Sequence, residues 1–249
     1  MVSLGFSKCK QRAMPYLALL EADLVSMTRS WVVRIWLGLM AVLALVMILS
    51  APAGGLPASE ALASLLATYP LIWSTFAIVV SGGAISSEAG VVADSILSKA
   101  VTRYEYILAK MTSRLITVLG LYLVVVLPSA YIIPRFSQDD LTGTGVAWAV
   151  LLIGMILVLL TNLSVTFSTL FNSTLVAVVV VWLLWYAASA IFVLLEVEYL
   201  SPASIIEGLP AVLQGDYAVA DQQQILAGFG LPAVVFALVA ILYFARKDL

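Results

Sequence analysis

Six long apolar stretches, separated by polar segments, dominate the chain. They lie at 31–50, 66–86, 112–133, 146–168, 174–195 and 225–244. Each holds about 20 residues, the length that an α-helix needs to cross a hydrocarbon core roughly 30 Å thick. The pattern predicts an all-α integral membrane protein with six transmembrane helices, in which residues 1–249 form one domain.

The segment before the first stretch, 1–30, has a different pattern. Apolar residues recur there at steps of three or four, so they share one face of a helix. These residues are Leu17, Leu20, Leu24, Met27 and Trp31. The spacing predicts an amphipathic helix lying flat at the membrane surface. A helix packed on another protein would show the same pattern and stays open as an alternative.

Composition agrees with a membrane protein. Of the 249 residues, 63% are hydrophobic and 10% are charged, whereas a soluble domain carries about 25% charged residues. The chain has no histidine and one cysteine, Cys9, so it holds neither a Ser-His-Asp arrangement nor an internal disulfide. A P-loop for ATP is also absent from the sequence. We therefore predict no catalytic residue, metal site or cofactor in this chain.

The distribution of charge predicts the orientation. Eleven of the twelve Lys and Arg residues lie in the segment through Arg34, in the loop counted through Arg114, and at the C-terminus. The other loops hold only Arg135 together with eight acids. By the positive-inside rule, both termini lie on the cytoplasmic side of the membrane. We expect this membrane to be the cell membrane, that is, the plasma or inner membrane. An even number of spans agrees with this orientation.

No Asp or Glu falls in the middle of an apolar stretch. Ion-coupled carriers usually keep ionisable residues at that depth, so a transporter of this kind would take its energy from outside the membrane. The polar residues of the fourth stretch include Asn162, Ser164, Thr166 and Ser168. They would either line a pathway or form hydrogen bonds between helices. Small residues at 81–84 in the second stretch favour close helix packing.

Two loops carry structure of their own. The outer loop, 196–224, contains Ser201-Pro202, a helix-start signal, and then Gly208-Leu209-Pro210, a helix-breaking signal. We expect two short helices at the outer surface, with an irregular loop as the alternative. In the cytoplasmic segment 87–111, Thr102 and Glu105 have the spacing of a capping box. This predicts a helix from about Arg103 into the third span, and a hairpin that turns at 99–101.

Residues 85–110, ISSEAGVVADSILSKAVTRYEYILAK, resemble the cytoplasmic segment of ABC-2 type permeases, the six-span subunits of ATP-driven exporters. The resemblance is closest to the sodium-efflux and nitrous-oxide-reductase-maturation branch. Its members typically show a Glu, a Gly, a Leu-Ser-Lys-Pro-Val-Ser-Arg run, a Glu-Tyr pair and a Lys. The matching residues are Glu88, Gly90, Leu97-Ser98-Lys99-Ala100-Val101-Thr102-Arg103, Glu105-Tyr106 and Lys110. Ala100 departs from the usual proline.

The resemblance implies a function and partners. A separate ATP-binding subunit, which holds the ATP and Mg, would dock on the coupling hairpin, and a second permease subunit would complete the pathway in the lipid bilayer. The residues expected to take part in coupling are Glu88, Lys99, Arg103, Tyr104, Glu105 and Lys110. This chain would itself have no ATPase activity, and no nucleic acid is expected as a partner. The uncharged spans do not select a substrate.

Several of these residues have a structural explanation as well. Capping explains Glu105 without any partner, and Glu88 would pair with Lys110 or Arg114 across the hairpin. Lys99 and Arg103 would either contact the ATP-binding subunit or anchor the hairpin to anionic lipid. A non-transporting membrane scaffold that recruits a soluble ATPase or maturation factor is the alternative function. A membrane enzyme acting on lipid has no catalytic constellation to support it.

Overall fold

The computed structural model describes residues 3–86, 102–195 and 197–246. Within these ranges the chain is helical and has no β-strand; one isolated bridge joins Pro57 to Gln138. Five helical segments are long and apolar enough to cross a membrane: Trp31–Pro52, Ala58–Gly82, Arg103–Phe136, Gly143–Leu170 and Val219–Arg246. The expected class, a helical multi-pass membrane protein, is confirmed at this level. Six spans and the orientation of the termini stay predictions.

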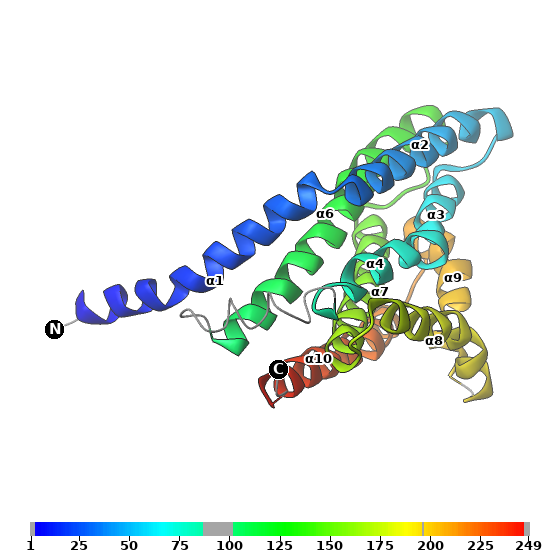
Figure 1. The fold of residues 1–249 in the computed structure, drawn as a ribbon. Helices are drawn as coiled ribbons and strands as arrows, with labels where there is room; N and C mark the ends of the chain where they lie inside the picture. The colour runs from blue at the N-terminus through cyan, green and yellow to red at the C-terminus, as the bar shows by residue number, and fades with distance from the viewer. Residues whose placement is uncertain (1–2, 87–101, 196, 247–249) are drawn as a thin grey trace.

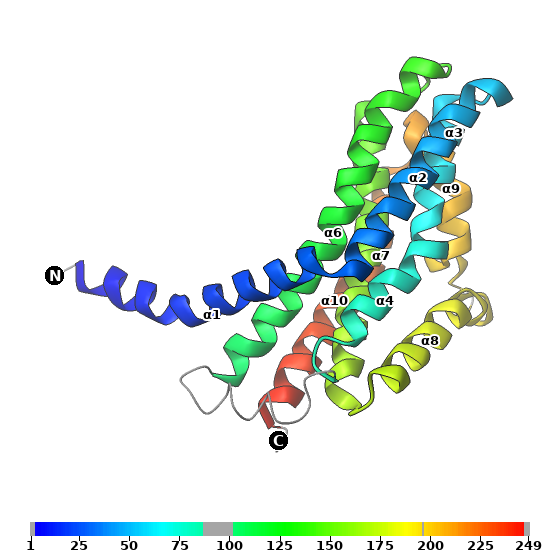
Figure 2. The same ribbon diagram turned by 45° about the horizontal axis from the view of Figure 1, so that its top comes forward.

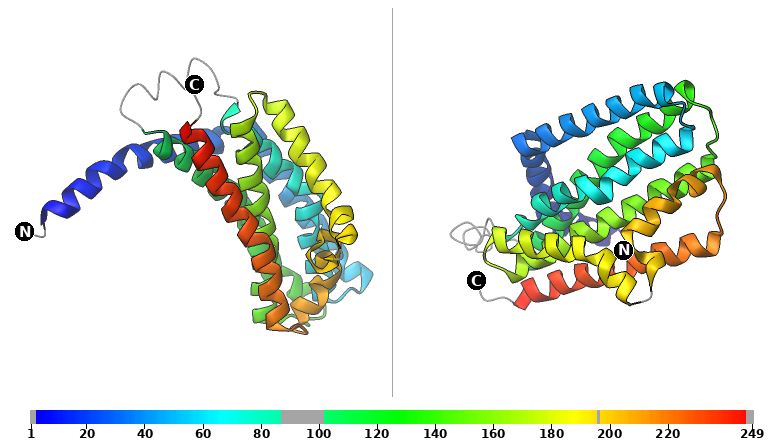
Figure 3. Two further views of the ribbon diagram at one scale, coloured as in Figure 1. Left: turned by 90° about the horizontal axis from the view of Figure 1, so that it is seen from below. Right: turned by 90° about the vertical axis from the view of Figure 1, so that its right-hand side faces the viewer.

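The long helices form a bundle from which the first helix projects. Helix α1 (Ser3–Arg29) ends at Ser30, and α2 (Trp31–Gly54) leaves in another direction (Figures 1 and 2). Helices α6 (Arg103–Phe136), α7 (Gly143–Leu170) and α10 (Val219–Arg246) run along the bundle. The first turn of α6 and the end of α10 lie at the same end of it (Figure 3).

The second predicted span contains three helical pieces. It begins at Ala58 rather than at 66, as α3 (Ala58–Thr68), and continues through a π-helix, η1 (Tyr69–Trp73), into α4 (Ser74–Gly82). Pro70 lacks an N–H and so weakens the regular α-helical ladder here. The carbonyls of Pro70 and Leu71 accept hydrogen bonds from the Trp185 indole at 2.9 Å and the Tyr186 hydroxyl at 2.5 Å.

Those aromatic residues come from α8 (Thr174–Leu194), which coincides with the fifth predicted span. Its apolar stretch, Thr174–Ala188, is shorter than the other five. A short 3-10 turn, η3 (Glu198–Leu200), then leads to α9 (Pro202–Gln214). Figure 2 shows α9 beside α3, above the end of α8.

Helix α9 differs from the two short helices expected in the outer loop. It runs through Gly208 and Pro210 without a break, from a Ser201 side-chain cap to Gly215, which has a φ of 90°. An internal proline costs a helix about 3 kcal/mol. Complete burial of Leu209 and Leu213 against the bundle offsets this cost. The sequence signals for breaking the helix are therefore overridden by tertiary packing.

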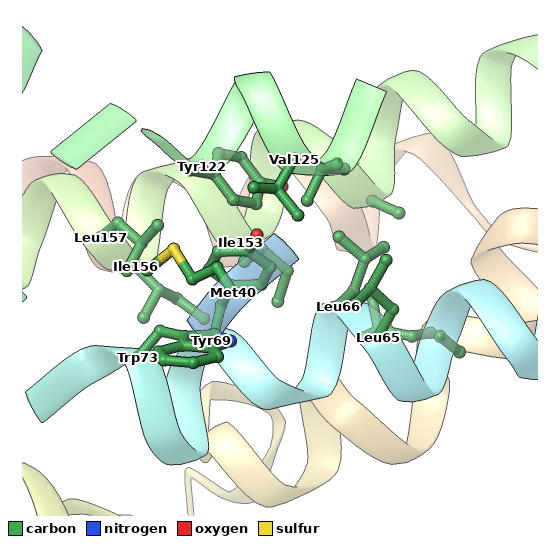
Figure 4. Packing of buried hydrophobic residues seen from close by; sticks show 14 of the residues in the cluster. Met40, Leu65, Leu66, Tyr69, Trp73, Tyr122, Val125, Ile153, Ile156 and Leu157 are labelled. Atoms are coloured by element: carbon green, nitrogen blue, oxygen red, sulfur yellow. The ribbon is translucent and has the colours of Figure 1, made fainter. Parts of the chain in front are cut away.

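The main apolar core lies where α2, α3, η1, α6 and α7 meet (Figure 4). The rings of Tyr69 and Tyr122 meet edge to face, with centroids 4.7 Å apart. The Tyr122 hydroxyl donates to the carbonyl of Val150 at 3.0 Å, which satisfies its polar group inside the core. Leu66 and Ile153, both fully buried, fill the space beside them.

A polar junction closes the end of the bundle opposite the first turn of α6. Helix α3 begins after Pro57, whose side chain cannot cap a helix. Asp140 supplies the cap from the loop between α6 and α7. Its carboxylate accepts the Ser59 N–H at 2.8 Å and the Ser59 hydroxyl at 2.5 Å. Gln214, at the end of α9, donates to the same carboxylate at 2.9 Å, so Asp140 joins three segments.

Replacing Asp140 should weaken this junction. Asp140→Ala removes a helix cap and one of the two acceptors of the Gln214 amide, which also donates to the Ser59 hydroxyl at 3.0 Å, so the free energy of unfolding should fall by about 1 to 2 kcal/mol. Thermal denaturation in detergent should show this as roughly 2 to 4 °C for each kcal/mol. Asp139→Ala is the matched control, because Asp139 is exposed and accepts only the Leu141 N–H, at 3.2 Å. Equal effects of the two substitutions would contradict the role given to Asp140.

The effect should also depend on pH. Partial burial raises the pKa of Asp140, but the hydrogen bonds from Ser59 and Gln214 lower it below its usual 3.8 overall. A carboxyl whose pKa is lowered by folding stabilises the fold above its unfolded pKa and loses that effect as pH falls through the folded pKa. The difference in the free energy of unfolding between wild type and Asp140→Ala should therefore have its full size at pH 5 to 7 and decrease below about pH 3.8.

Candidate functional site at the junction of α1 and α6

Helix α6 begins with the capping box that the sequence predicts. The Glu105 N–H donates to the Thr102 hydroxyl oxygen at 3.2 Å, and the Glu105 carboxylate accepts the Thr102 N–H at 2.8 Å. These hydrogen bonds lower the pKa of Glu105, so it is charged at neutral pH. The helix then runs without interruption from Arg103 to Phe136. The end of segment 87–111 is thus rigidly joined to a helix long enough to cross the membrane.

The first turns of α6 have one buried and one exposed face. Tyr106 is buried and stacks on Phe244 of α10, with ring centroids 5.6 Å apart. Ile107 and Met111 belong to the same small apolar cluster, which also includes Ala84 and Ile85, just after α4, and Val165 of α7. Tyr104 and Leu108, one helical turn apart, are 51% and 41% exposed. This end of α6 is therefore held on one face and accessible on the other.

A buried ion pair joins α6 to α1. The Lys110 ammonium lies 2.7 Å from one oxygen of Asp23, and an Arg114 guanidinium nitrogen lies 3.5 Å from the other. Asp23 and Lys110 are each 9% exposed, and Arg114 is 4% exposed. Arg114 also donates to the sulfur of Met27, and the Tyr16 hydroxyl donates to Thr112 at 3.1 Å. Polar contacts thus join α1 to α6, beside apolar packing of Leu19 and Met27.

The charges of this cluster depend on one another. Burial raises the pKa of Asp23, but the Arg114 charge and the hydrogen bond from Lys110 lower it below 3.8 overall. Asp23 therefore stays ionised at neutral pH and offsets one of two neighbouring positive charges. A buried ion taken away from its partner is costly, because water no longer solvates it. The pairing consequently favours one position of α1 against α6.

The sequence did not predict Asp23 as a member of the site. Of the residues predicted to form the apolar face of this helix, Leu17 is 55% exposed. The face of α1 that meets α6 carries Tyr16 and Asp23 in addition to Met27, which belongs to the predicted apolar face. A possible signal was the presence of an acid within a largely apolar segment, since such an acid needs a basic partner. Which basic residues pair with Asp23 is seen only in the folded structure.

The residues expected to couple the chain to an ATP-binding subunit have different locations. Glu88 and Lys99 lie outside the described residues, so the pairing of Glu88 with Lys110 or Arg114 stays a prediction. Lys110 is directed toward α1 and bound to Asp23, and a role in coupling would act through α1. Tyr104 is exposed, and Arg103 is partly exposed beside it. Among the four that the structure describes, Tyr104 is the most exposed, and Arg103 and Glu105 are half-buried.

Three of the four polar residues expected in the fourth span form hydrogen bonds to other segments of the bundle. Asn162 donates to the carbonyl of Ala233 at 3.1 Å, and Thr166 donates to that of Phe236 at 2.8 Å, both in α10. Ser168 accepts the N–H groups of Ile85 and Ser86, each at 3.0 Å. Ser164 donates to its own helix at Leu160. All four are buried, and their role as a pathway lining stays a prediction.

The small residues at the end of the second span allow close packing, as expected. A Cβ atom on Gly82 would lie 2.7 Å from a methyl group of Val178, closer than such atoms approach in proteins. Gly82 therefore permits the close contact between α4 and α8. This is one position where the sequence pattern and the packing agree directly.

Comparison of the sequence with models of known protein families and with curated proteins gives no match. The described residues also contain no group of three His, Cys, Asp or Glu side chains that could hold a metal ion. The chemistry that the junction of α1 and α6 supports is electrostatic and mechanical. A force on the first turns of α6 would act on a buried ion pair and on the start of a long helix.

Removal of the Asp23 carboxylate should release α1. Asp23→Ala leaves Lys110 and Arg114 buried with no compensating acid, which costs about 3 kcal/mol or more. We expect faster amide hydrogen exchange in 16–29 and about the first two turns of α6, measured by mass spectrometry. Glu21→Ala is the control, because Glu21 is an exposed acid in the same part of α1. Exchange in 16–29 that is unchanged in Asp23→Ala would contradict the role of this pair.

Proposed function

We propose that this chain is the membrane-spanning subunit of an ATP-driven exporter of the ABC-2 type. A separate ATP-binding subunit docks on segment 87–111, and two permease subunits form the pathway between them. ATP binding moves the docked segments, and the movement passes into the spanning helices. The chain has both termini in the cytoplasm and hydrolyses no ATP alone.

The observation that carries this proposal is the continuity of α6. The helix begins with a capping box just after the segment that resembles the docking hairpin of these permeases, and it continues to Phe136. A displacement at its first turn can therefore pass along one continuous helix, which includes Pro128 and Pro134, to the opposite end of the bundle. Stacking of Tyr106 on Phe244 carries the same displacement to α10, and the Asp23 ion pairs carry it to α1.

The first experiment tests docking and energy supply together. The purified chain is mixed with a candidate ATP-binding subunit from the same source, and association and ATP hydrolysis are both measured. We expect no hydrolysis by the chain alone and a stable complex in which hydrolysis depends on the partner. Hydrolysis by the purified chain alone would overturn the proposal. A stable complex that moves no substrate and does not stimulate hydrolysis would instead support a scaffold.

Charge reversal should distinguish the effect of contacts at the docking segment on association from the effect of net charge alone. Lys99→Glu combined with Arg103→Glu should weaken association with the ATP-binding subunit at least tenfold, since it reverses two positive charges at the docking segment. Lys8→Glu combined with Lys10→Glu changes the net charge equally at the far end of α1 and should leave association unchanged. If both double variants behave alike, the docking role of the hairpin is wrong.

Two substitutions at Glu105 distinguish capping from contact with a partner. Glutamine also completes a capping box, so Glu105→Gln should preserve both the start of α6 and association. Glu105→Ala should fray the first turn by about 1 kcal/mol, seen as roughly fivefold faster exchange of the hydrogen-bonded amides at 105–107. Loss of association in Glu105→Gln, with the helix start intact, would show that the charge of Glu105 contacts the partner.

A further inference from the structure

A small cavity lies where α2 and α6 end, far from the junction of α1 and α6. Its volume is about 370 Å³. Figures 1 and 2 show the last turns of these two helices side by side. The residues that line the cavity include Pro52, Gly55, Leu56, Arg135, Phe136 and Ser137. Because both helices are long enough to cross a membrane, their ends lie at the level of the lipid headgroups.

Arg135 gives the cavity a positive charge. Its guanidinium lies 4.3 Å from the centre of the Tyr131 ring and donates one hydrogen bond to the Tyr131 hydroxyl. Among the described residues, no carboxylate forms an ion pair with Arg135. The nearest acids in sequence are engaged elsewhere: Asp139 accepts the Leu141 N–H, and Asp140 binds Ser59. The guanidinium has five N–H groups, so a planar pair of donors remains available for an anion.

The helix ends next to the cavity limit how strongly it attracts an anion. Helix C-termini carry partial negative charge on their last carbonyls. Here several of those carbonyls are satisfied: those of Ala51 and Pro52 accept from Leu56 and Gly55, and that of Ile133 accepts from Ser137. Arg135, in the last turn of α6, further offsets this charge. The cavity is therefore lined by the Arg135 cation, which has unused N–H donors, and the carbonyl groups named above already accept hydrogen bonds.

The remaining wall combines apolar surface with one unused polar group. Leu56 and Phe136 are 41% and 62% exposed, so they present apolar surface at the mouth of the cavity. The Ser137 hydroxyl is buried and has no hydrogen-bond partner within the described ranges. Aromatic and arginine side chains at the end of a spanning helix are typical of the membrane interface. The cavity thus offers a charged donor, a polar donor and apolar walls to one ligand.

We propose that this cavity binds the phosphodiester headgroup of a membrane lipid. The phosphate oxygens accept hydrogen bonds from Arg135 and the Ser137 hydroxyl, and the acyl chains leave over Leu56 and Phe136. The bound lipid ties the end of α2 to the end of α6. The site depends only on these two helices crossing the membrane, so it is independent of the transport function proposed above.

The test compares lipids that share chains or headgroups. The full-length chain in detergent is titrated with dioleoyl phosphatidylglycerol, with dioleoylglycerol, which lacks the phosphate, and with inorganic phosphate, and binding is followed by native mass spectrometry. We expect Arg135→Gln to weaken phosphatidylglycerol binding about tenfold, since it removes a charged pair of donors. The matched control is Arg34→Gln, since Arg34 is an exposed arginine at the other end of α2. This substitution should leave phosphatidylglycerol binding at the cavity unchanged.

A photoactivatable phosphatidylglycerol locates the site directly. In wild type and Arg34→Gln it should label residues 52–56 or 131–138, and in Arg135→Gln this labelling should fall about tenfold. Arg135→Lys keeps the positive charge and replaces Arg135→Gln in the test if the glutamine variant does not fold. We expect Arg135→Lys to reduce labelling at least twofold, but less than Arg135→Gln does. Labelling that is insensitive to both substitutions would overturn the proposal. Tight binding of inorganic phosphate that displaces the lipid would also overturn it, because the site would then belong to a free anion.

Discussion

The ion pairs of Asp23 with Lys110 and Arg114 are the constraint on which the cytoplasm-facing part of the proposed permease depends. Two basic side chains that are almost fully buried need an acid nearby, and α1 provides it. Surface ion pairs are worth little, but separating a buried pair exposes each ion to a large desolvation cost. Moving α1 away from its position against α6 is therefore costly in free energy.

Inside the bundle, polar side chains form hydrogen bonds with backbone groups of neighbouring segments. Trp185 and Tyr186 bind carbonyls at the π-helix, and Ser168 caps the N–H groups where α4 ends. Asn162 and Thr166 reach carbonyls of α10 in the same way. In an apolar medium an unmatched polar group is expensive, so these bonds specify which helices are neighbours. The same bonds would have to be kept or exchanged if the helices move during transport.

The two ends of α6 have contrasting environments. At its start, packing against α10 and ion pairs with α1 hold three helices together, while Tyr104 and Leu108 stay accessible. At its other end, Arg135 faces an open cavity beside the end of α2. One long, capped helix thus connects an accessible surface at one end with a charged cavity at the other. This geometry supports a helix that transmits displacement and is positioned by a ligand at its far end.

The sequence alone determined the class, most helix positions and the cap of α6. Apolar length and the Thr102 and Glu105 pair are local properties, which do not depend on the fold. Only the tertiary structure decided the partner of Asp23, the early start of α3 under the Asp140 cap, the π-helix at Tyr69–Trp73 and the unbroken α9. Each of these depends on a side chain from a distant segment. Pairing across the bundle follows from three-dimensional proximity and burial, and a linear pattern of hydrophobic residues does not encode which distant groups meet.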